Sequence, residues 1–393
     1  MMTRDELREL AQFHSDKGDE CALSFYFQPQ TPHNKSHREE SILAKDLVRQ
    51  AVRELKAKSK HKPNGCASHA LERILQIAEG LPGSRAQAKA VFAYDRQGYW
   101  REFDLPAQLA ASKLVVGNRF YLRPLAELLG AQPRLGVALV DRRRARLFEL
   151  RLDELTERED LFGSLPRRGR GDGYAGYDAG HAERRVADEA LHHFKHVAER
   201  LKEQAETGVW EKLIMACHEP IWPELEAQLH PYVRQRLLGH FAADVHTASN
   251  GFIREQAARI FQESLEARRQ KLAEEAIAQA RGHGRGVTGL RRVLQSLERG
   301  ELQTLLIGES YSARAVECPV CGHLDSHLAP QCAVCGAQTR ELEDVCEAVI
   351  PFAICHDIEI LYVKDNAELD GVGNIAALLR YSSKGATAMR AAS

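Results

Sequence analysis

The chain has 393 residues, of which 44% are hydrophobic, so it is long enough for two or three domains with ordinary buried cores. Its formal net charge at pH 7 is −1, which excludes a protein that binds polyanions through its overall charge. The N-terminal sequence MMTRDELREL lacks the apolar segment of a secretory signal, and no run of about 18 apolar residues predicts a membrane span. We therefore expect a cytoplasmic monomer with no membrane partner.

The first third of the chain predicts a small α/β unit. The apolar stretch at residues 22–28 predicts a short buried strand. Hydrophobic spacing predicts amphipathic helices at residues 40–58 and 69–81, and residues 89–106 predict a β-hairpin rich in β-branched and aromatic side chains. We expect this unit to end near Pro133.

The middle of the chain alternates strands and helices, which favours an α/β sheet domain. Residues 134–155 predict a hairpin with a basic turn at Asp141–Arg144. A strand is expected at residues 210–220, a helix at 225–238 and a strand at 241–247. The turn arginines, together with Arg146, indicate either a phosphate-binding patch or a solvated hairpin turn, and the two interpretations have equal weight.

The last third begins with a long charged helix at residues 252–280. A helix, a glycine turn and a strand are then expected within residues 286–307. The apolar stretch at residues 348–363 predicts one or two strands, and residues 371–381 predict a final short helix.

Two C-x-x-C motifs, separated by ten residues and each followed by glycine, predict a metal site. Such knuckles turn two thiolates toward one point, and four thiolates leave no open position on a tetrahedral zinc ion. We therefore expect structural zinc, and the alternative is four ordinary thiols. We interpret His323 and His327 as bystanders and Cys346 and Cys355 as core residues. The predicted ligands are Cys318, Cys321, Cys332 and Cys335.

Residues 165–194, LPRRGRGDGYAGYDAGHAERRVADEALHHF, predict a basic glycine-rich loop that runs into a helix. Glycine lets the backbone approach a partner closely, arginine can hold phosphate with two hydrogen bonds, and tyrosine can stack on an unpaired base. The composition indicates a finger that orders against RNA, and the alternative is a surface loop without a role. We interpret the histidines of the helix as a solvated face. The candidate RNA-binding residues are Arg167, Arg168, Arg170, Gly171, Gly173, Tyr174, Ala175, Gly176, Tyr177, Gly180, His181, Arg184 and Arg185.

Three features of the sequence occur together in one known order. The basic loop opens a long helix after a hairpin, the stretch DVHTASNGFIREQAARIF closes that domain, and the chain ends with Gly371-Val372-Gly373-Asn374-Ile375 and Leu379-Arg380-Tyr381. Over roughly residues 134–381 this order resembles the archaeal and eukaryotic class-one peptide-release factors and their relative Pelota. The likeness is greatest to the bacterial branch of that superfamily, which includes Balon-like ribosome hibernation factors.

The resemblance implies an α/β fold with three domains. Residues 1–133 would form an N-terminal accessory or docking domain. Residues 134–252 would form a middle domain whose RNase-H-like sheet carries the loop. Residues 253–393 would resemble kink-turn-binding ribosomal proteins, with the zinc-binding insertion at residues 316–337.

The loop departs from the family where release factors carry Gly-Gly-Gln, the motif that helps to place the attacking water. Here Ala175-Gly176-Tyr177 or Ala179-Gly180-His181 stands at that place, and neither contains glutamine. The resemblance therefore implies a protein without catalytic residues that occupies the ribosomal A site during hibernation or stress, with elongation factor Tu as a candidate delivery partner. One alternative is a peptidyl-tRNA hydrolase or rescue factor with a noncanonical loop, and another is an RNA- or protein-binding module that never enters the ribosome.

Overall fold

The computed structural model describes residues 3–15, 21–28, 38–58, 68–80, 88–105, 112–129, 133–151, 154–162 and 179–381. The chain divides into two compact units: a middle unit, Ala131–Arg268, and a composite unit that combines Met1–Gly130 with Arg269–Ser393. Among the helices described, none is both long enough and apolar enough to cross a membrane.

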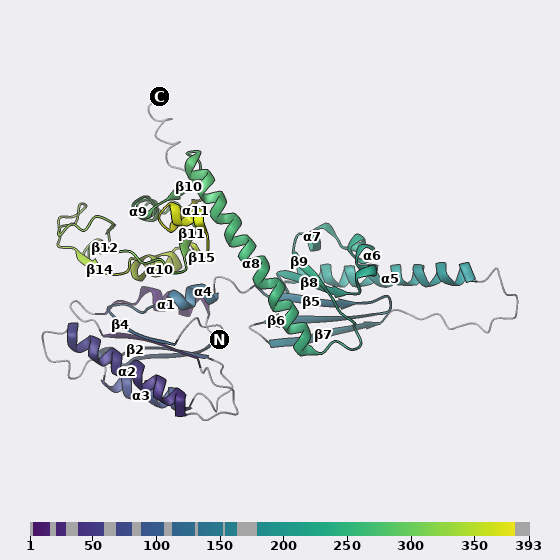
Figure 1. Cartoon of the computed structure of the whole chain (residues 1–393), viewed down its shortest axis with the longest axis horizontal. Coiled ribbons are helices and arrows are strands. Elements are labelled where there is room, and N and C mark those ends of the chain that lie inside the picture. The colour runs from purple at the N-terminus through teal and green to yellow at the C-terminus, as the bar shows by residue number, and fades with distance from the viewer. Residues whose placement is uncertain are drawn as a thin grey trace. The chain divides into compact units, whose positions relative to one another are not determined.

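The middle unit is built on a five-stranded mixed sheet with the order β7-β6-β5-β8-β9 (Figure 1). β5, β6 and β7 are antiparallel neighbours, whereas β8 and β9 run parallel to β5. The central strand β5 is buried on both faces, which explains its unbroken apolar sequence LGVALV. The strands are β5 (Leu135–Val140), β6 (Arg144–Arg151), β7 (Glu154–Phe162), β8 (Lys212–Cys217) and β9 (Leu237–Ala242).

Helices cover both faces of this sheet. Successive residues of β5 point to opposite faces, so each face contributes its own set of β5 side chains to a core. Ala138 and Val140 pack under α5 (Ala179–Glu206), α6 (Trp222–Gln228) and α7 (Pro231–Arg234). Leu135, Val137 and Leu139 pack against the first half of α8 (Asn250–Arg281). A 3₁₀ turn, η3 (Glu219–Ile221), joins β8 to α6.

The N-terminal part of the composite unit contains an antiparallel sheet with the order β3-β2-β1-β4. Apolar residues of β1 at alternate positions, Leu23, Phe25 and Phe27, pack with α2 and α3 on one face of the sheet. The elements are α1 (Arg4–Gln12), β1 (Ala22–Phe27), α2 (Arg38–Lys58), α3 (Ser68–Gly80), β2 (Ala88–Tyr94), η2 (Asp95–Gln97), β3 (Tyr99–Leu105), β4 (Lys113–Gly117) and α4 (Arg123–Leu129).

The C-terminal part of this unit contains a second sheet with the order β10-β16-β11-β15 and a small three-stranded sheet, β13-β12-β14. One hydrophobic core joins the two parts of the unit, with Tyr26 and Phe92 in the same cluster as Leu305 and Val349. The elements are β10 (Gly286–Thr288), α9 (Leu290–Glu298), β11 (Leu302–Gly308), β12 (Ala315–Glu317), β13 (Leu324–Asp325), β14 (Arg340–Leu342), α10 (Cys346–Cys355), β15 (Glu359–Val363), α11 (Ala367–Gly371) and β16 (Ile375–Leu379). The three-domain division with boundaries at 133 and 252 stays a prediction.

Four predicted elements of the C-terminal two thirds were wrong, and one of them is the strand expected at 241–247, which instead runs as β9 from Leu237 to Ala242. The stretch at 348–363 begins in helix α10 and becomes a strand only at Glu359, because a short apolar run does not distinguish a buried helix from a strand. Residues 375–379 form strand β16 between two other strands, not a helix. The helix expected at 225–238 stops before His230–Pro231, and β9 starts at Leu237.

Candidate functional site

Most of the predicted RNA-binding loop lies outside the described residues. This holds for the nine candidates from Arg167 to Tyr177. The structure places Gly180, His181, Arg184 and Arg185 in the first turns of α5, without describing their side chains.

The rest of α5 is held firmly against the sheet. Ala190, Phe194, Val197 and Leu201 recur at helical spacing, and each is at most 3% exposed. The helix that follows the loop therefore has a fixed position in the middle unit.

The prediction of a solvated histidine face on α5 is only partly right. His192 and His196 are exposed, as expected. His193 is 3% exposed, and burial lowers the pKa of its imidazole, so it is a neutral core residue.

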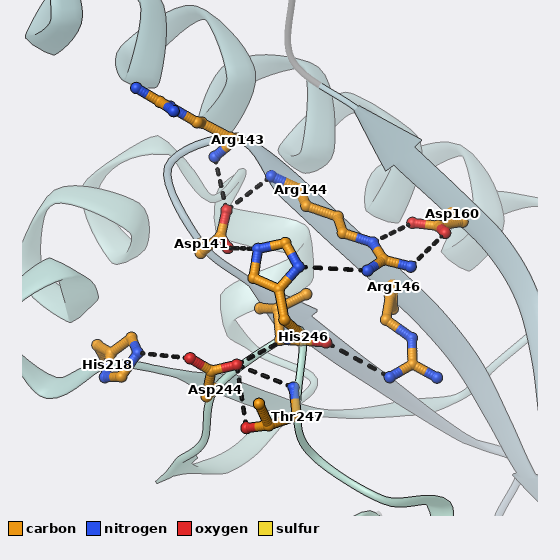
Figure 2. A network of polar contacts seen from close by, with 10 residues as sticks. Asp141, Arg143, Arg144, Arg146, Asp160, His218, Asp244, His246 and Thr247 are labelled. Carbon is orange, nitrogen blue, oxygen red and sulfur yellow. Dashed lines mark hydrogen bonds and ion pairs between the residues drawn. The ribbon is translucent and has the colours of Figure 1, made fainter.

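The carboxyl ends of β5, β8 and β9 meet at one edge of the sheet and carry a network of charged groups (Figure 2). Asp141 follows β5 and accepts hydrogen bonds from the backbone N–H groups of Arg143 and Arg144, both at 2.7 Å. Asp244 follows β9 in the same way, and its carboxylate accepts the backbone N–H groups of His246 and Thr247 at 2.8 and 2.9 Å. These bonds hold the pKa of Asp244 below its usual value.

His246 joins the two loops of this network. Its Nε2 lies 3.2 Å from the carboxylate of Asp141, and its Nδ1 lies 3.4 Å from a guanidinium nitrogen of Arg144. Both ring nitrogens therefore face a partner, so the imidazole is not a free general base. The arrangement fixes the segment between β9 and α8.

Arg144 and Arg146 of this hairpin are neutralised by carboxylates, whereas the exposed side chain of Arg143 makes no ion pair or hydrogen bond with a described residue. Arg144 forms two hydrogen bonds with Asp160, at 2.9 and 2.7 Å, and Arg146 forms two with Glu157, at 2.9 and 2.8 Å (Figure 2 shows the first pair). The hydrogen bonds from these arginines lower the pKa of both carboxyl groups. The structure therefore favours the solvated-turn interpretation for Arg144 and Arg146.

The two C-x-x-C motifs converge on one point in the composite unit. The four Sγ atoms lie within 4.8 Å of one another, with 3.4 Å between Cys318 and Cys335 and 3.6 Å between Cys321 and Cys332. A tetrahedral zinc ion with Zn–S bonds of about 2.3 Å separates its sulfurs by about 3.8 Å, so this thiol set fits the ion.

Backbone amides prepare two of these thiols for metal. The N–H groups of Cys321 and Val320 point at the sulfur of Cys318 and lower the pKa of that thiol to about 6. The amides of Cys335 and Val334 lower the pKa of Cys332 in the same way. His323 lies beside the cluster, but its ring pairs with Glu298 at 2.5 Å. Among the described residues, the side chains that converge as metal ligands are the four cysteines, without His323.

A buried carboxylate fastens the segment that carries these cysteines, residues 315–342, which we call the cysteine minidomain. The side chain of Glu317 is 6% exposed and lies between the guanidinium groups of Arg119 and Arg340, the second at 2.5 Å. Arg119 follows β4, so this ion pair joins the N-terminal part of the unit to the minidomain. Sequence reasoning missed Glu317, because a charged residue next to Cys318 carries no sign of burial.

Residues 121–281 match the model of a protein family described as bacterial archaeo-eukaryotic release factor family 10. A peptide chain release factor subunit 1 from Thermococcus onnurineus is 25% identical over 294 residues, which cover 67% of this chain and 69% of the relative. Both matches are to proteins described as release factors.

Solved structures of the same group are similar at low identity. Archaeoglobus fulgidus Pelota is 12% identical with a TM-score of 0.38, covering 98% of this chain and 94% of that one. A model of ribosome-bound archaeal Pelota and ABCE1 contains a chain that is 14% identical with a TM-score of 0.40, covering 96% and 94%. Likeness at this level does not bear on function.

Proposed function

We propose that this chain, which is similar to release factors, binds the ribosome and occupies the A site without hydrolysing peptidyl-tRNA. The observation that carries the proposal is the family match over residues 121–281, which spans a loop without Gly-Gly-Gln. A factor that enters the A site but lacks the residue that helps to place water blocks the site. Such a block suits hibernation or protection during stress.

The predicted loop supplies the contact in this proposal. Its arginines, Arg167, Arg168 and Arg170, would hold phosphates of ribosomal RNA near the peptidyl-transferase centre, and Tyr174 or Tyr177 would stack on a base. The packing of α5 against the sheet supports this role, because a site next to a rigid element is more precisely held than one on a mobile segment.

A second candidate function is peptide release or ribosome rescue. It is favoured by the relative from Thermococcus onnurineus, which is described as a peptide chain release factor subunit. Release by such factors depends on positioning water and stabilising charge, and backbone amides can contribute to both. In this case Tyr177 or His181 would lie near the ester.

We also propose that the four thiols of the minidomain hold zinc. Four thiolates complete the tetrahedron, so zinc would stabilise the minidomain and have no position for substrate.

The sheet order β7-β6-β5-β8-β9 supports the RNase-H-like assignment of the middle domain. The kink-turn-protein-like assignment of the C-terminal domain is likewise a proposal. The proposed function also includes elongation factor Tu as the delivery partner and a cytoplasmic location.

Co-sedimentation with vacant 70S ribosomes tests the proposal. We expect the full-length protein to pellet with 70S particles and to release no peptide from ribosomes that carry peptidyl-tRNA in the P site. Peptide release would establish the second function instead. Failure to pellet at low salt would contradict both.

A further inference from the structure

Most arginines of the described chain face a carboxylate or a carbonyl, but several exposed ones do not, and four of these lie close together in one short segment. Between residues 285 and 299, four arginine side chains are exposed and make no ion pair or hydrogen bond with any described residue. They are Arg285, Arg291, Arg292 and Arg299. An unpaired guanidinium keeps all its N–H donors free for an anion.

Helix α9 brings three of these arginines onto its solvent side. Its buried face is formed by Val293, Leu294 and Leu297, which pack in the core of the composite unit. The outward positions at the two ends of the helix carry Arg291 and Arg292 at one end and Arg299 just beyond the other. Seven residues of helix separate Arg292 from Arg299, a rise of about 10 Å.

Arg285 lies at the same end of the sheet as Arg299. The backbone N–H of Leu379 donates to the carbonyl of Arg285, and the N–H of the next residue, Arg380, donates to the carbonyl of Glu301. The end of strand β16 therefore lies between Arg285 and the segment that contains Arg299. Arg291 and Arg292 lie at the start of α9, next to Gly289, whose N–H donates to the carbonyl of Ile375 at the other end of β16.

Nearby acidic groups do not cancel this charge. Glu298, on the same helix, is engaged by the His323 ring at 2.5 Å and by the backbone N–H of Leu324 at 3.0 Å. Glu301 is 3% exposed and is turned away from solvent. The solvent side of α9 is therefore positively charged although the whole chain is nearly neutral.

The position of Arg291 and Arg292 is unfavourable for the helix itself. Both lie in the first turn of α9, which contains no acidic residue, so their charge opposes the helix dipole. A charge that opposes the helix dipole, with no stabilising contact to offset it, is a sign of a functional surface. A bound anion would compensate, since it is attracted both by the arginines and by the free N–H groups of the helix N-terminus.

We propose that Arg285, Arg291, Arg292 and Arg299 bind the phosphate backbone of structured RNA. Arginine holds phosphate with paired hydrogen bonds, and several unpaired arginines on one surface can contact several phosphates of one backbone. Contacts of this kind position a protein and do not read sequence. The identification of that RNA as ribosomal rests on the proposed function, whereas the binding surface does not.

The test compares two full-length variants that lose the same number of charges. In the first, the four unpaired arginines are changed to alanine. In the control, four exposed arginines that each pair with a carboxylate are changed instead: Arg49, Arg101, Arg259 and Arg314. Binding to a short fluorescent RNA duplex and to 70S ribosomes is measured over a series of KCl concentrations.

Each phosphate contact contributes about 0.7 to 0.9 to the slope of log K against log salt, so we expect the first variant to lose roughly 3 from that slope for the duplex. The control should lose less than about 1. Circular dichroism should show the first variant folded, because it removes an unfavourable charge from the helix N-terminus.

The two readouts separate failure of this inference from failure of the proposed function. If the wild type does not pellet with ribosomes but duplex binding still depends on these arginines, the inference holds and the ribosome proposal fails. An unchanged slope in the first variant, with normal pelleting, overturns the inference alone. Loss of ribosome binding with unchanged duplex binding also overturns it, and would point to an acidic protein partner.

Discussion

Changing Glu317 to glutamine should weaken the attachment of the cysteine minidomain to the rest of the composite unit. The substitution removes the one negative charge between Arg119 and Arg340, whose side chains are 14% and 35% exposed. Removing one partner of a buried ion pair costs about 3 to 5 kcal/mol because the remaining charge is left unpaired. Water reaches Arg340 here, and glutamine can still accept one hydrogen bond, so we expect about 3 kcal/mol, near the lower limit.

Hydrogen exchange followed by mass spectrometry measures this change separately for each segment. A loss of about 3 kcal/mol corresponds to roughly a hundredfold increase in opening, because 1.4 kcal/mol is a factor of ten. We expect it in the peptides of β12, β14 and the segment after β4. The matched control is Glu341→Gln, whose partner Arg314 is 63% exposed, and a surface pair of this kind contributes only about 0 to 1 kcal/mol. Equal effects of the two substitutions would refute the reasoning from burial.

Three further predictions concern the sheet, the acid response and the metal. Gly136→Ala should cost about 1 to 3 kcal/mol in urea unfolding, because its Cβ would lie 2.8 Å from the ring of Trp210, whereas Gly251→Ala, with space around it, should change little. The lowered pKa of Asp160 means that its pair with Arg144 contributes stability above about pH 4, which is lost as the pH falls below that value. The stability difference between wild type and Asp160→Asn should therefore shrink in acid, and a constant difference would contradict it. Native mass spectrometry should show one zinc ion per chain, and its removal by a chelator should raise exchange in the minidomain.

Local patterns predicted the elements whose sequence has a single interpretation. The hairpin at 89–106 and the strand at 22–28 were confirmed, because alternation and turn residues agree there. Two of the wrong elements, at 348–363 and 371–381, contain short apolar runs of the C-terminal part, where the position in the sheet decides between helix and strand. Residues 375–379 form a strand because they lie between β10 and β11, a neighbourhood that sequence spacing does not contain.

The sites show the same division. Both C-x-x-C motifs carry the spacing of the cluster in the sequence itself, so the convergence of the four thiols was predictable. The partners of the basic turn were not predictable, because Arg144 pairs with Asp160 on β7, a strand that the sequence patterns did not predict. A run of arginines therefore does not distinguish a phosphate site from an ion-pair ladder, because the difference lies in the strand opposite.

This distinction bears on how a chain with a net charge of −1 can bind RNA. At about 0.1 M salt, charges more than about 10 Å apart are largely screened, so the distribution of unpaired charge matters more than its sum. In the middle unit, Arg144 and Arg146 are matched by carboxylates at hydrogen-bond distance, so their field is cancelled locally. Along α9 the guanidinium groups have no such match within the described chain. The near-neutral composition therefore does not oppose RNA binding, provided that the contact is made through surfaces such as this one.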